Sequence, residues 1–169
     1  MRLHAKFAVV ALAGAGFAAW RAVPRHAAPT ATMVCERLWL GGNVAAPPGG
    51  AEAVLNLSHS PDPYQARFHR WEPLRNAAPT PTVEWLRSQT TFVAEQRRAG
   101  RTVFVHCHGG VSRSAMVVAA CLMAELGCTS DEALATLRAR RPEVALNPVF
   151  RPLLAAWESA LRRAAPRGN

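Results

Sequence analysis

Apolar and polar residues along this chain alternate between the short period of strands and the longer period of helices. Four runs have the length and the β-branched or aromatic content of strands, and glycine, proline or polar residues bound them. These predicted strands cover residues 36–40, 53–58, 68–71 and 103–107. Because a helical segment separates the last two runs and further helical segments follow the last one, the pattern predicts an α/β fold with a small, mainly parallel central sheet flanked by helices.

Two of the helical segments lie before and after the last predicted strand. The first is expected to start at Thr80 as N-cap, with Pro81 at the first helical position. Gly100 suits its C-terminal end, because glycine readily adopts the left-handed conformation found there. The second segment, residues 114–126, is apolar on all sides and is therefore expected to be buried.

Two further helices are predicted towards the end of the chain. Thr129 and Glu132 have the spacing of a capping box, so a helix should begin there and stop before Pro142. Asn147, followed by proline, opens the last helix. The apolar stripe of this last helix consists of Leu153, Leu154, Trp157 and Leu161.

The first 32 residues are not expected to belong to the fold. Residues 7–20 carry no charge and are flanked by basic residues, but they fall short of the about 20 residues of a full membrane span. With residues up to 23 the segment can still anchor the chain, since the side chain of Arg21 can reach the interface. We predict an N-terminal membrane anchor over residues 7–23. A cleaved signal peptide followed by export, or an organellar targeting segment, stays open.

A proline- and alanine-rich linker is expected over residues 23–32, and one folded domain over residues 33–169. A domain of about 135 residues can bury a single core without metals or disulfides. Basic residues flank the apolar segment on both sides, so charge does not determine its orientation.

The chain carries a net charge of +9, and 19 of its 20 basic residues are arginine. These arginines are scattered, and no basic patch is interleaved with aromatic residues, so a nucleic-acid partner is not expected. We interpret the charge mainly as compositional bias. A basic surface would still attract anionic partners.

The four cysteines are Cys35, Cys107, Cys121 and Cys128. They form no CxxC or Cys/His pattern of a metal site, although His106 and His108 flank Cys107, and no zinc or other metal is expected. Cys121 lies in the apolar helix and is interpreted as a core residue. The sequence leaves open whether Cys35 and Cys128 are free or paired.

A cysteine and an arginine with five residues between them join the last predicted strand to the apolar helix. Backbone N–H groups from His108 to Arg113 lack helical partners, so they can converge on an anion at the positive end of the helix dipole. The same field favours a thiolate at Cys107, and the planar guanidinium of Arg113 can hold two oxygens of a phosphate. This run therefore predicts a phosphate-binding loop with a nucleophile at its base.

The residues His106-Cys107, Gly110 and Arg113-Ser114 match the pattern HCxxGxxRS. On this motif the chain resembles the dual-specificity branch of the cysteine-dependent protein tyrosine phosphatases, over roughly residues 33–161. Weaker support comes from a Trp-Leu-Gly-Gly opening and from Arg140-Arg141-Pro142 with Asn147 downstream.

The resemblance implies a reaction and roles for the loop residues. The thiolate of Cys107 would attack phosphorus and form a phosphocysteine, with Arg113 and Ser114 as the other catalytic residues. Ser114 would hydrogen-bond the cysteine sulfur; a plain helix cap is its alternative role. The resemblance further implies phosphorylated protein substrates and no cofactor. The phosphate-binding residues would be His108, Gly109, Gly110, Val111, Ser112 and Arg113.

The family's general acid is usually an aspartate that follows a proline and a hydrophobic residue, upstream of the nucleophile. Here the corresponding position is Asn76, 31 residues before Cys107, and an amide cannot supply that proton. Asp62 and Glu72 are the nearest replacements.

Two classes of function follow from these residues. The first is a phosphoprotein phosphatase for phosphotyrosine, with phosphoserine and phosphothreonine left open, or else for phosphoinositides or other phosphomonoesters. The second is a phosphate-recognising module with little turnover. Because Cys107 and Arg113 are both present, we favour the enzyme. A catalytic thiolate favours a reducing compartment, hence the cytoplasmic side of the membrane.

Overall fold

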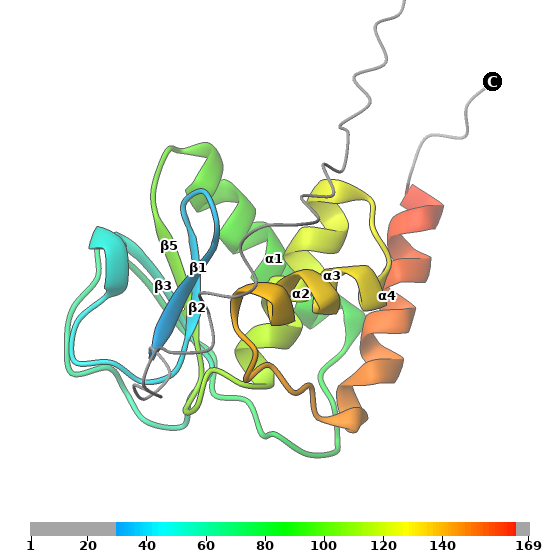
Figure 1. Ribbon diagram of the computed structural model, residues 1–169, viewed down its shortest axis with the longest axis horizontal. Helices are drawn as coiled ribbons and strands as arrows, with labels where there is room; N and C mark the ends of the chain where they lie inside the picture. The colour runs from blue at the N-terminus through cyan, green and yellow to red at the C-terminus, as the bar shows by residue number, and fades with distance from the viewer. Residues whose placement is uncertain (1–29, 165–169) are drawn as a thin grey trace, which may run out of the picture.

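A computed structural model describes the protein over residues 30–164, which form a five-stranded sheet with helices packed against one face (Figure 1). In their order across the sheet, the strands are β1 (Ala31–Cys35), β2 (Leu38–Gly41), β5 (Val103–His106), β3 (Ala53–Asn56) and β4 (Phe68–Trp71). The helices are α1 (Val83–Arg98), α2 (Arg113–Leu126), α3 (Ser130–Arg140) and α4 (Arg151–Ala164). Strand β1 pairs antiparallel with β2 and the other pairings are parallel. The predicted α/β class with a mainly parallel sheet is confirmed.

Strand β5 lies in the middle of the sheet, between β2 and β3. The register pairs His106, its last residue, with Gly41 on one side and with Asn56 on the other. Carboxyl ends of parallel strands meet at one edge of a sheet, which is where ligands commonly bind in α/β folds. The chain that follows β5 therefore starts between the ends of β2 and β3.

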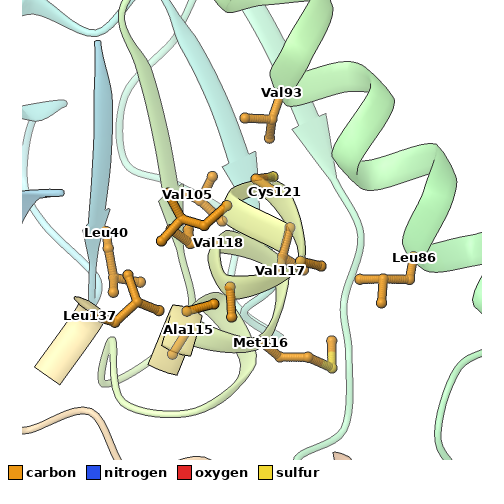
Figure 2. Close-up of a cluster of buried hydrophobic side chains, with 14 of the residues drawn as sticks. Leu40, Leu86, Val93, Val105, Ala115, Met116, Val117, Val118, Cys121 and Leu137 are labelled. Carbon is orange, nitrogen blue, oxygen red and sulfur yellow. The ribbon is translucent and has the colours of Figure 1, made fainter. Parts of the chain in front are cut away.

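Helix α2 forms the centre of the core. Its residues from Ser114 to Met123 are all buried, and it packs against the sheet and against α1, α3 and α4. Figure 2 shows its side chains between Leu40 and Val105 of the sheet and Leu86 and Val93 of α1. Fully burying one such large apolar side chain stabilises the fold by about 1.5–3 kcal/mol. The all-round apolar pattern of this helix thus reflects burial on every side.

The opposite face of the sheet carries a smaller apolar cluster. Val54 and Phe104 are fully buried there, and Trp39 and Tyr64 pack against them. Strands β3 and β5 are therefore covered on both faces, which explains why they appear in the sequence as continuous apolar runs.

The domain begins with a hairpin rather than with the single strand predicted over residues 36–40. Glu36 and Arg37 form its turn, with φ of 58° at Arg37. Strand β1 begins at Ala31, two residues before the expected start of the domain and inside the expected linker. Pairing with β2 and the burial of Val34 hold this short segment in the sheet.

Helix α1 starts later than predicted. Its N-cap is Thr82, whose Oγ1 accepts the amide of Trp85 at 3.1 Å, so the prediction of Thr80 as the cap is wrong. Two threonines beside one proline offered competing caps, and the second one bonds to the helix. The capping box of α3 is confirmed, with Thr129 and Glu132 bonded to each other's backbone.

Cys35 and Cys128 are half-buried free thiols, and Cys121 is buried in the core. Within residues 30–164, no single helix is long and apolar enough to cross a membrane; only α2 and α3 together pass on length and composition, across a bend of 117°. The anchor over residues 7–23 lies outside the described residues and stays a prediction.

Candidate active site

The loop between β5 and α2 holds a thiol at its base. Cys107 directly follows β5 and is 2% exposed. Its Sγ lies 3.3 Å from the Oγ of Ser114, whose hydroxyl also reaches the carbonyl oxygen of Gly41 at 3.4 Å. The N-cap residue of α2 is Ser112, so Ser114 lies inside the first turn. The helix-cap interpretation of Ser114 is therefore wrong, and its hydroxyl is placed at the sulfur.

The surroundings of Cys107 favour its thiolate. Burial alone would raise the pKa of this thiol, but hydrogen bonds from Ser114, the charge of Arg113 and the amide of Gly110 outweigh burial. The pKa of Cys107 therefore lies below its ordinary value, and the positive end of α2 acts in the same direction. Burial raises the pKa of Cys121 to about 12, so the two buried thiols differ in kind.

We expect iodoacetamide to alkylate Cys107 first, because the pKa values of Cys35, Cys121 and Cys128 are all raised by burial. Only the thiolate reacts, and a lowered pKa keeps it populated at neutral pH. The rate should therefore fall only as the pH drops through a midpoint below the ordinary thiol value of about 8.5. Peptide mapping over a pH series measures this midpoint.

Ser114→Ala is the informative comparison, because it removes a hydrogen bond that favours the thiolate. The midpoint should move upward in this variant. An unchanged midpoint would mean that Ser114 does not stabilise the thiolate.

Two glycines bring the loop against the residues that end β2. Gly110 has φ of +66°, and a Cβ built there would lie 2.3 Å from the carbonyl carbon of Gly41. Gly109 pairs with Gly42 in an isolated antiparallel bridge. The positive φ and this close approach both require glycine at position 110. The tight loop is thus supported from the side of β2.

Arg113, the first residue of α2, is fixed by the backbone that follows β3 and β4. Its Nη1 donates to the carbonyl oxygen of Leu57 at 3.2 Å and to that of Leu74 at 3.0 Å. Because a guanidinium carries five N–H donors, these two bonds leave donors for an anion in the loop. The predicted fork is therefore held in place before any ligand binds.

The predicted phosphate-binding residues 108–113 form one continuous loop, and neighbours from other parts of the chain contact it. The carbonyl oxygen of His108 accepts the amide of Asn43 at 3.0 Å, and the two side chains lie 3.5 Å apart at Nδ1 and Nδ2. Asn43 was not anticipated from the sequence, where it is an ordinary polar residue after two glycines. Arg141 and Asn147 supported the resemblance, but the contacts that they make with this loop were not predicted from the sequence.

Asn76 lies at this loop. Its Oδ1 accepts the hydroxyl of Ser112 at 2.8 Å, and its carbonyl oxygen accepts Nδ2 of Asn147 at 2.7 Å. The position predicted for the general acid is thus beside the phosphate loop and holds an amide.

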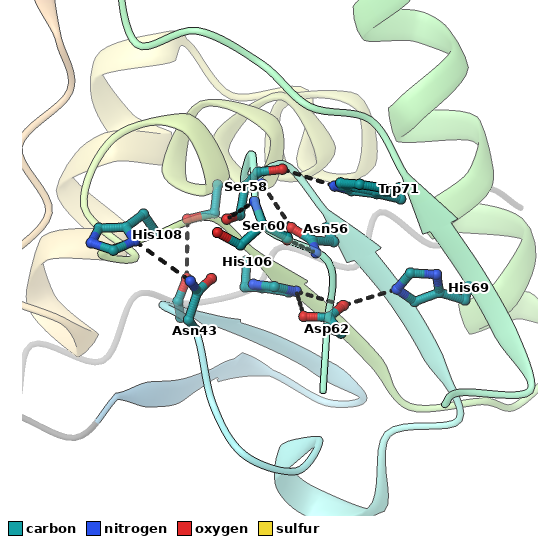
Figure 3. Close-up of polar contacts among 11 residues, drawn as sticks. Asn43, Asn56, Ser58, Ser60, Asp62, His69, Trp71, His106 and His108 are labelled. Atoms are coloured by element: carbon teal, nitrogen blue, oxygen red, sulfur yellow. Dashed lines mark hydrogen bonds and ion pairs between the residues drawn. The ribbon is translucent and has the colours of Figure 1, made fainter. Parts of the chain in front are cut away.

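Asp62, the first alternative acid, is bonded to two histidines (Figure 3). Its Oδ2 lies 2.8 Å from Nε2 of His69 and its Oδ1 lies 3.1 Å from Nε2 of His106. The Asp62 side chain is 4% exposed. Burial lowers the pKa of His106, and the carboxylate of Asp62 opposes this shift. Asp62 therefore orients the buried histidine that precedes Cys107, and its carboxylate faces the histidines.

Glu72, the second alternative, follows β4, and its Oε2 accepts Nε1 of Trp85 in α1 at 3.4 Å. Of the three acid candidates, the structure thus brings Asn76 into hydrogen-bond contact with the loop, while the carboxylates of Asp62 and Glu72 have their partners elsewhere.

Comparison with known proteins matches this arrangement. Residues 50–160 fit the family described as dual specificity phosphatase, catalytic domain. The chain belongs to this family. It is a branch of the protein tyrosine phosphatase superfamily, so the resemblance inferred from the loop is confirmed.

Among its relatives, mouse dual specificity protein phosphatase 12 is 35% identical over 149 residues, covering 82% of this chain and 44% of the relative. Human dual specificity protein phosphatase 8 is 32% identical, covering 67% of this chain and 19% of the relative. The chain spans less than half the length of these curated relatives. The crystal structure of human DUSP28 is similar with a TM-score of 0.72 and 28% identity, covering 83% of this chain and 97% of that one.

Proposed function

We propose that the protein is a cysteine-dependent phosphatase of phosphoproteins that acts through a phosphocysteine and prefers phosphotyrosine. The observation that carries this proposal is the thiol of Cys107, which is buried at the base of the loop with its pKa lowered by Ser114, Arg113 and Gly110. A merely structural buried thiol, such as Cys121, has a raised pKa.

In the first step the Cys107 thiolate attacks phosphorus in line with the leaving oxygen. The bond from sulfur to phosphorus forms while the bond from phosphorus to the substrate oxygen breaks. Amides of residues 108–113 and the guanidinium of Arg113 hold the other phosphate oxygens, and their charge stabilisation acts mostly in the transition state. Catalysis in this step consists of positioning and electrostatics.

In the second step water attacks phosphorus, inorganic phosphate leaves and the thiolate is restored. The sulfur is now the leaving group. The hydroxyl of Ser114, 3.3 Å from Sγ, can donate to the returning thiolate and so lower the cost of breaking its bond to phosphorus.

Asn76 supports the preference for phosphotyrosine. A tyrosine phenolate, with a pKa of about 10, departs without much help, whereas the far more basic alkoxide of serine or threonine needs a proton. The amide of Asn76 cannot give one. Its Oδ1 is already occupied by the Ser112 hydroxyl at 2.8 Å, so the side chain is also held in one orientation.

At pH values near the pKa of the new acid or below it, Asn76→Asp is expected to raise turnover of phosphoserine peptides by about tenfold or more and to change aryl phosphate turnover little. Because Ser112 would donate to the new carboxylate, the ionised form is favoured and the pKa of the new acid should stay low. The rate on phosphoserine should therefore fall as the pH rises through that low pKa. Steady-state kinetics against pH, with both substrates, measure this.

Asn76→Ala is the matched control, and it should leave the ratio of phosphoserine turnover to aryl phosphate turnover unchanged. If Asp62→Asn or Glu72→Gln abolishes turnover while Asn76→Asp has no effect, the proton comes from another carboxyl and the assignment of Asn76 fails.

A phosphate-recognising module with little turnover is the second candidate, and Asn76 is the observation that favours it. The two differ in one measurement: the module binds phosphotyrosine peptides well but does not release phosphate from them. Including a phosphoinositide in the same assay distinguishes a protein substrate from a lipid one.

A further inference from the structure

A buried arginine lies behind the phosphate loop. Arg141, at the C-terminal end of α3, is 4% exposed. Its Nε donates to the carbonyl oxygen of Gly110 at 3.0 Å, and its Nη2 reaches that of Gly109 at 3.5 Å. Its Nη1 donates to Oγ1 of Thr32 in β1 at 3.3 Å. One side chain thus connects the first strand of the domain to two consecutive carbonyl groups of the loop.

The segment after Arg141 continues this pattern along the loop. The amide of Ala145 donates to the carbonyl oxygen of Val111 at 3.1 Å, and the amide of Asn147 donates to the Oγ of Ser112 at 3.0 Å. Residues 141–147 therefore supply donors to positions 109, 110, 111 and 112 in order.

These bonds determine which way the loop amides face. In a trans peptide the carbonyl oxygen and the following N–H point in opposite directions. Holding the carbonyl oxygens of Gly109, Gly110 and Val111 towards residues 141–147 turns the next three N–H groups to the other side, where Cys107 and the anion site lie. A loop without these donors could rotate its glycine peptides and present carbonyl oxygens to a phosphate.

We propose that residues 141–147, led by Arg141, form a positioning element that keeps the loop amides turned towards the phosphate. Arg141 touches neither the substrate nor the reacting sulfur and acts through the Gly109 and Gly110 peptides. This inference rests on the proposed function, because it assumes that the loop binds the phosphate of a substrate.

One of the oriented amides also serves the nucleophile. The amide of Gly110 is among the groups that lower the pKa of Cys107. It belongs to the peptide whose carbonyl oxygen, that of Gly109, Arg141 contacts at 3.5 Å. Loss of Arg141 should therefore weaken anion binding and thiolate stabilisation together.

The test compares Arg141→Met and Arg141→Lys with the wild-type protein. Inorganic phosphate is the probe, with its affinity measured by calorimetry, and the alkylation midpoint of Cys107 reports the thiolate. We expect Arg141→Met to bind phosphate at least about tenfold more weakly than the wild type. The loss follows from removing the hydrogen bonds that orient the amides which bind the charged ligand. The alkylation midpoint should move upward. Arg141→Lys keeps a donor and should recover part of both losses.

Arg140→Met is the matched control. Arg140 is the exposed neighbour of Arg141 on α3, and its substitution by methionine removes the same charge. It should bind phosphate like the wild type. Thermal unfolding of each variant checks the fold. If Arg141→Met does not fold, Arg141→Lys provides the test, and its phosphate affinity should then be measurably weaker and its alkylation midpoint higher than in the wild type.

Two results would overturn the inference. Wild-type phosphate affinity and an unshifted alkylation midpoint in folded Arg141 variants would show that the loop orients itself. An equal loss of phosphate affinity in Arg140→Met would show that the effect comes from the lower net positive charge and not from the bonds of Arg141 to the loop. Failure of the proposed function is distinct from both, since the wild-type protein would then bind no phosphate and Cys107 would not react first.

Discussion

Replacing Cys107 by serine is expected to abolish hydrolysis of aryl phosphates and phosphotyrosine peptides, with a loss of at least about 10³-fold, while phosphate binding persists. A serine hydroxyl is far less acidic than a thiol, so the groups that stabilise the thiolate cannot ionise it at neutral pH. The amides of the loop and Arg113 are unchanged in this variant and still hold the anion. Phosphate release assays and calorimetry with the same peptide measure the two properties separately.

Cys128→Ser provides the control, because Cys128 is a half-buried free thiol with a raised pKa at the far end of α2. This variant should turn over like the wild type. Turnover by Cys107→Ser near the wild-type rate would exclude a phosphocysteine and with it the proposed mechanism.

Arg113→Lys is expected to lower kcat/KM by about 10²-fold or more, close to the loss of a transition-state hydrogen-bond donor in other enzymes. Arg113 has two tasks in the proposed mechanism. Its Nη1 bonds to the carbonyl oxygens of Leu57 and Leu74, and its remaining N–H donors would hold the phosphate. A lysine ammonium is a point charge with three donors and no fork, so it cannot keep both sets of bonds. The loss should appear mainly in kcat, because the phosphoryl oxygens need the fork most in the transition state.

Arg151→Lys is a suitable control for the same substitution, since Arg151 is exposed in α4 and its ion-pair partner is the exposed Asp131. Near wild-type kinetics for Arg113→Lys would mean that the guanidinium does not bind the reacting phosphoryl group, and the assigned loop geometry would be wrong.

Local sequence signals predicted the loop and most elements that hold it. Three of these signals are local: the run from Cys107 to Ser114, the capping box at Thr129 and the all-round apolar helix. Each depends on residues within one turn or one segment, so it can be interpreted without knowledge of tertiary contacts. The hairpin strand β1 was missed because its five residues lie beside a proline-rich stretch and become a strand only by pairing with β2.

The contacts that decide roles at the site were not predictable, because they join residues far apart in the chain. Arg141 meets Gly110 across 31 positions and Thr32 across 109. Asp62 was an acid candidate because it is one of the carboxylates nearest in sequence to Asn76, and only the fold shows its carboxylate between His69 and His106. The spacing of residues in the sequence predicts the kind of chemistry at Cys107. Which residues hold the phosphate loop in place is decided by the packing of β1, α3 and the loops.

The bond between Thr32 and Arg141 links ligand binding to the stability of the whole domain. Because the phosphate loop is bonded to Arg141, which is itself bonded to Thr32 of the first strand, the anion site depends on the folding of both β1 and the end of α3. A ligand that binds the folded state alone, present at 100 times its Kd, adds about 2.7 kcal/mol to the free energy of unfolding. If the proposed function holds, phosphate in a storage buffer is therefore expected to raise the free energy of unfolding of this protein as well as to occupy its site.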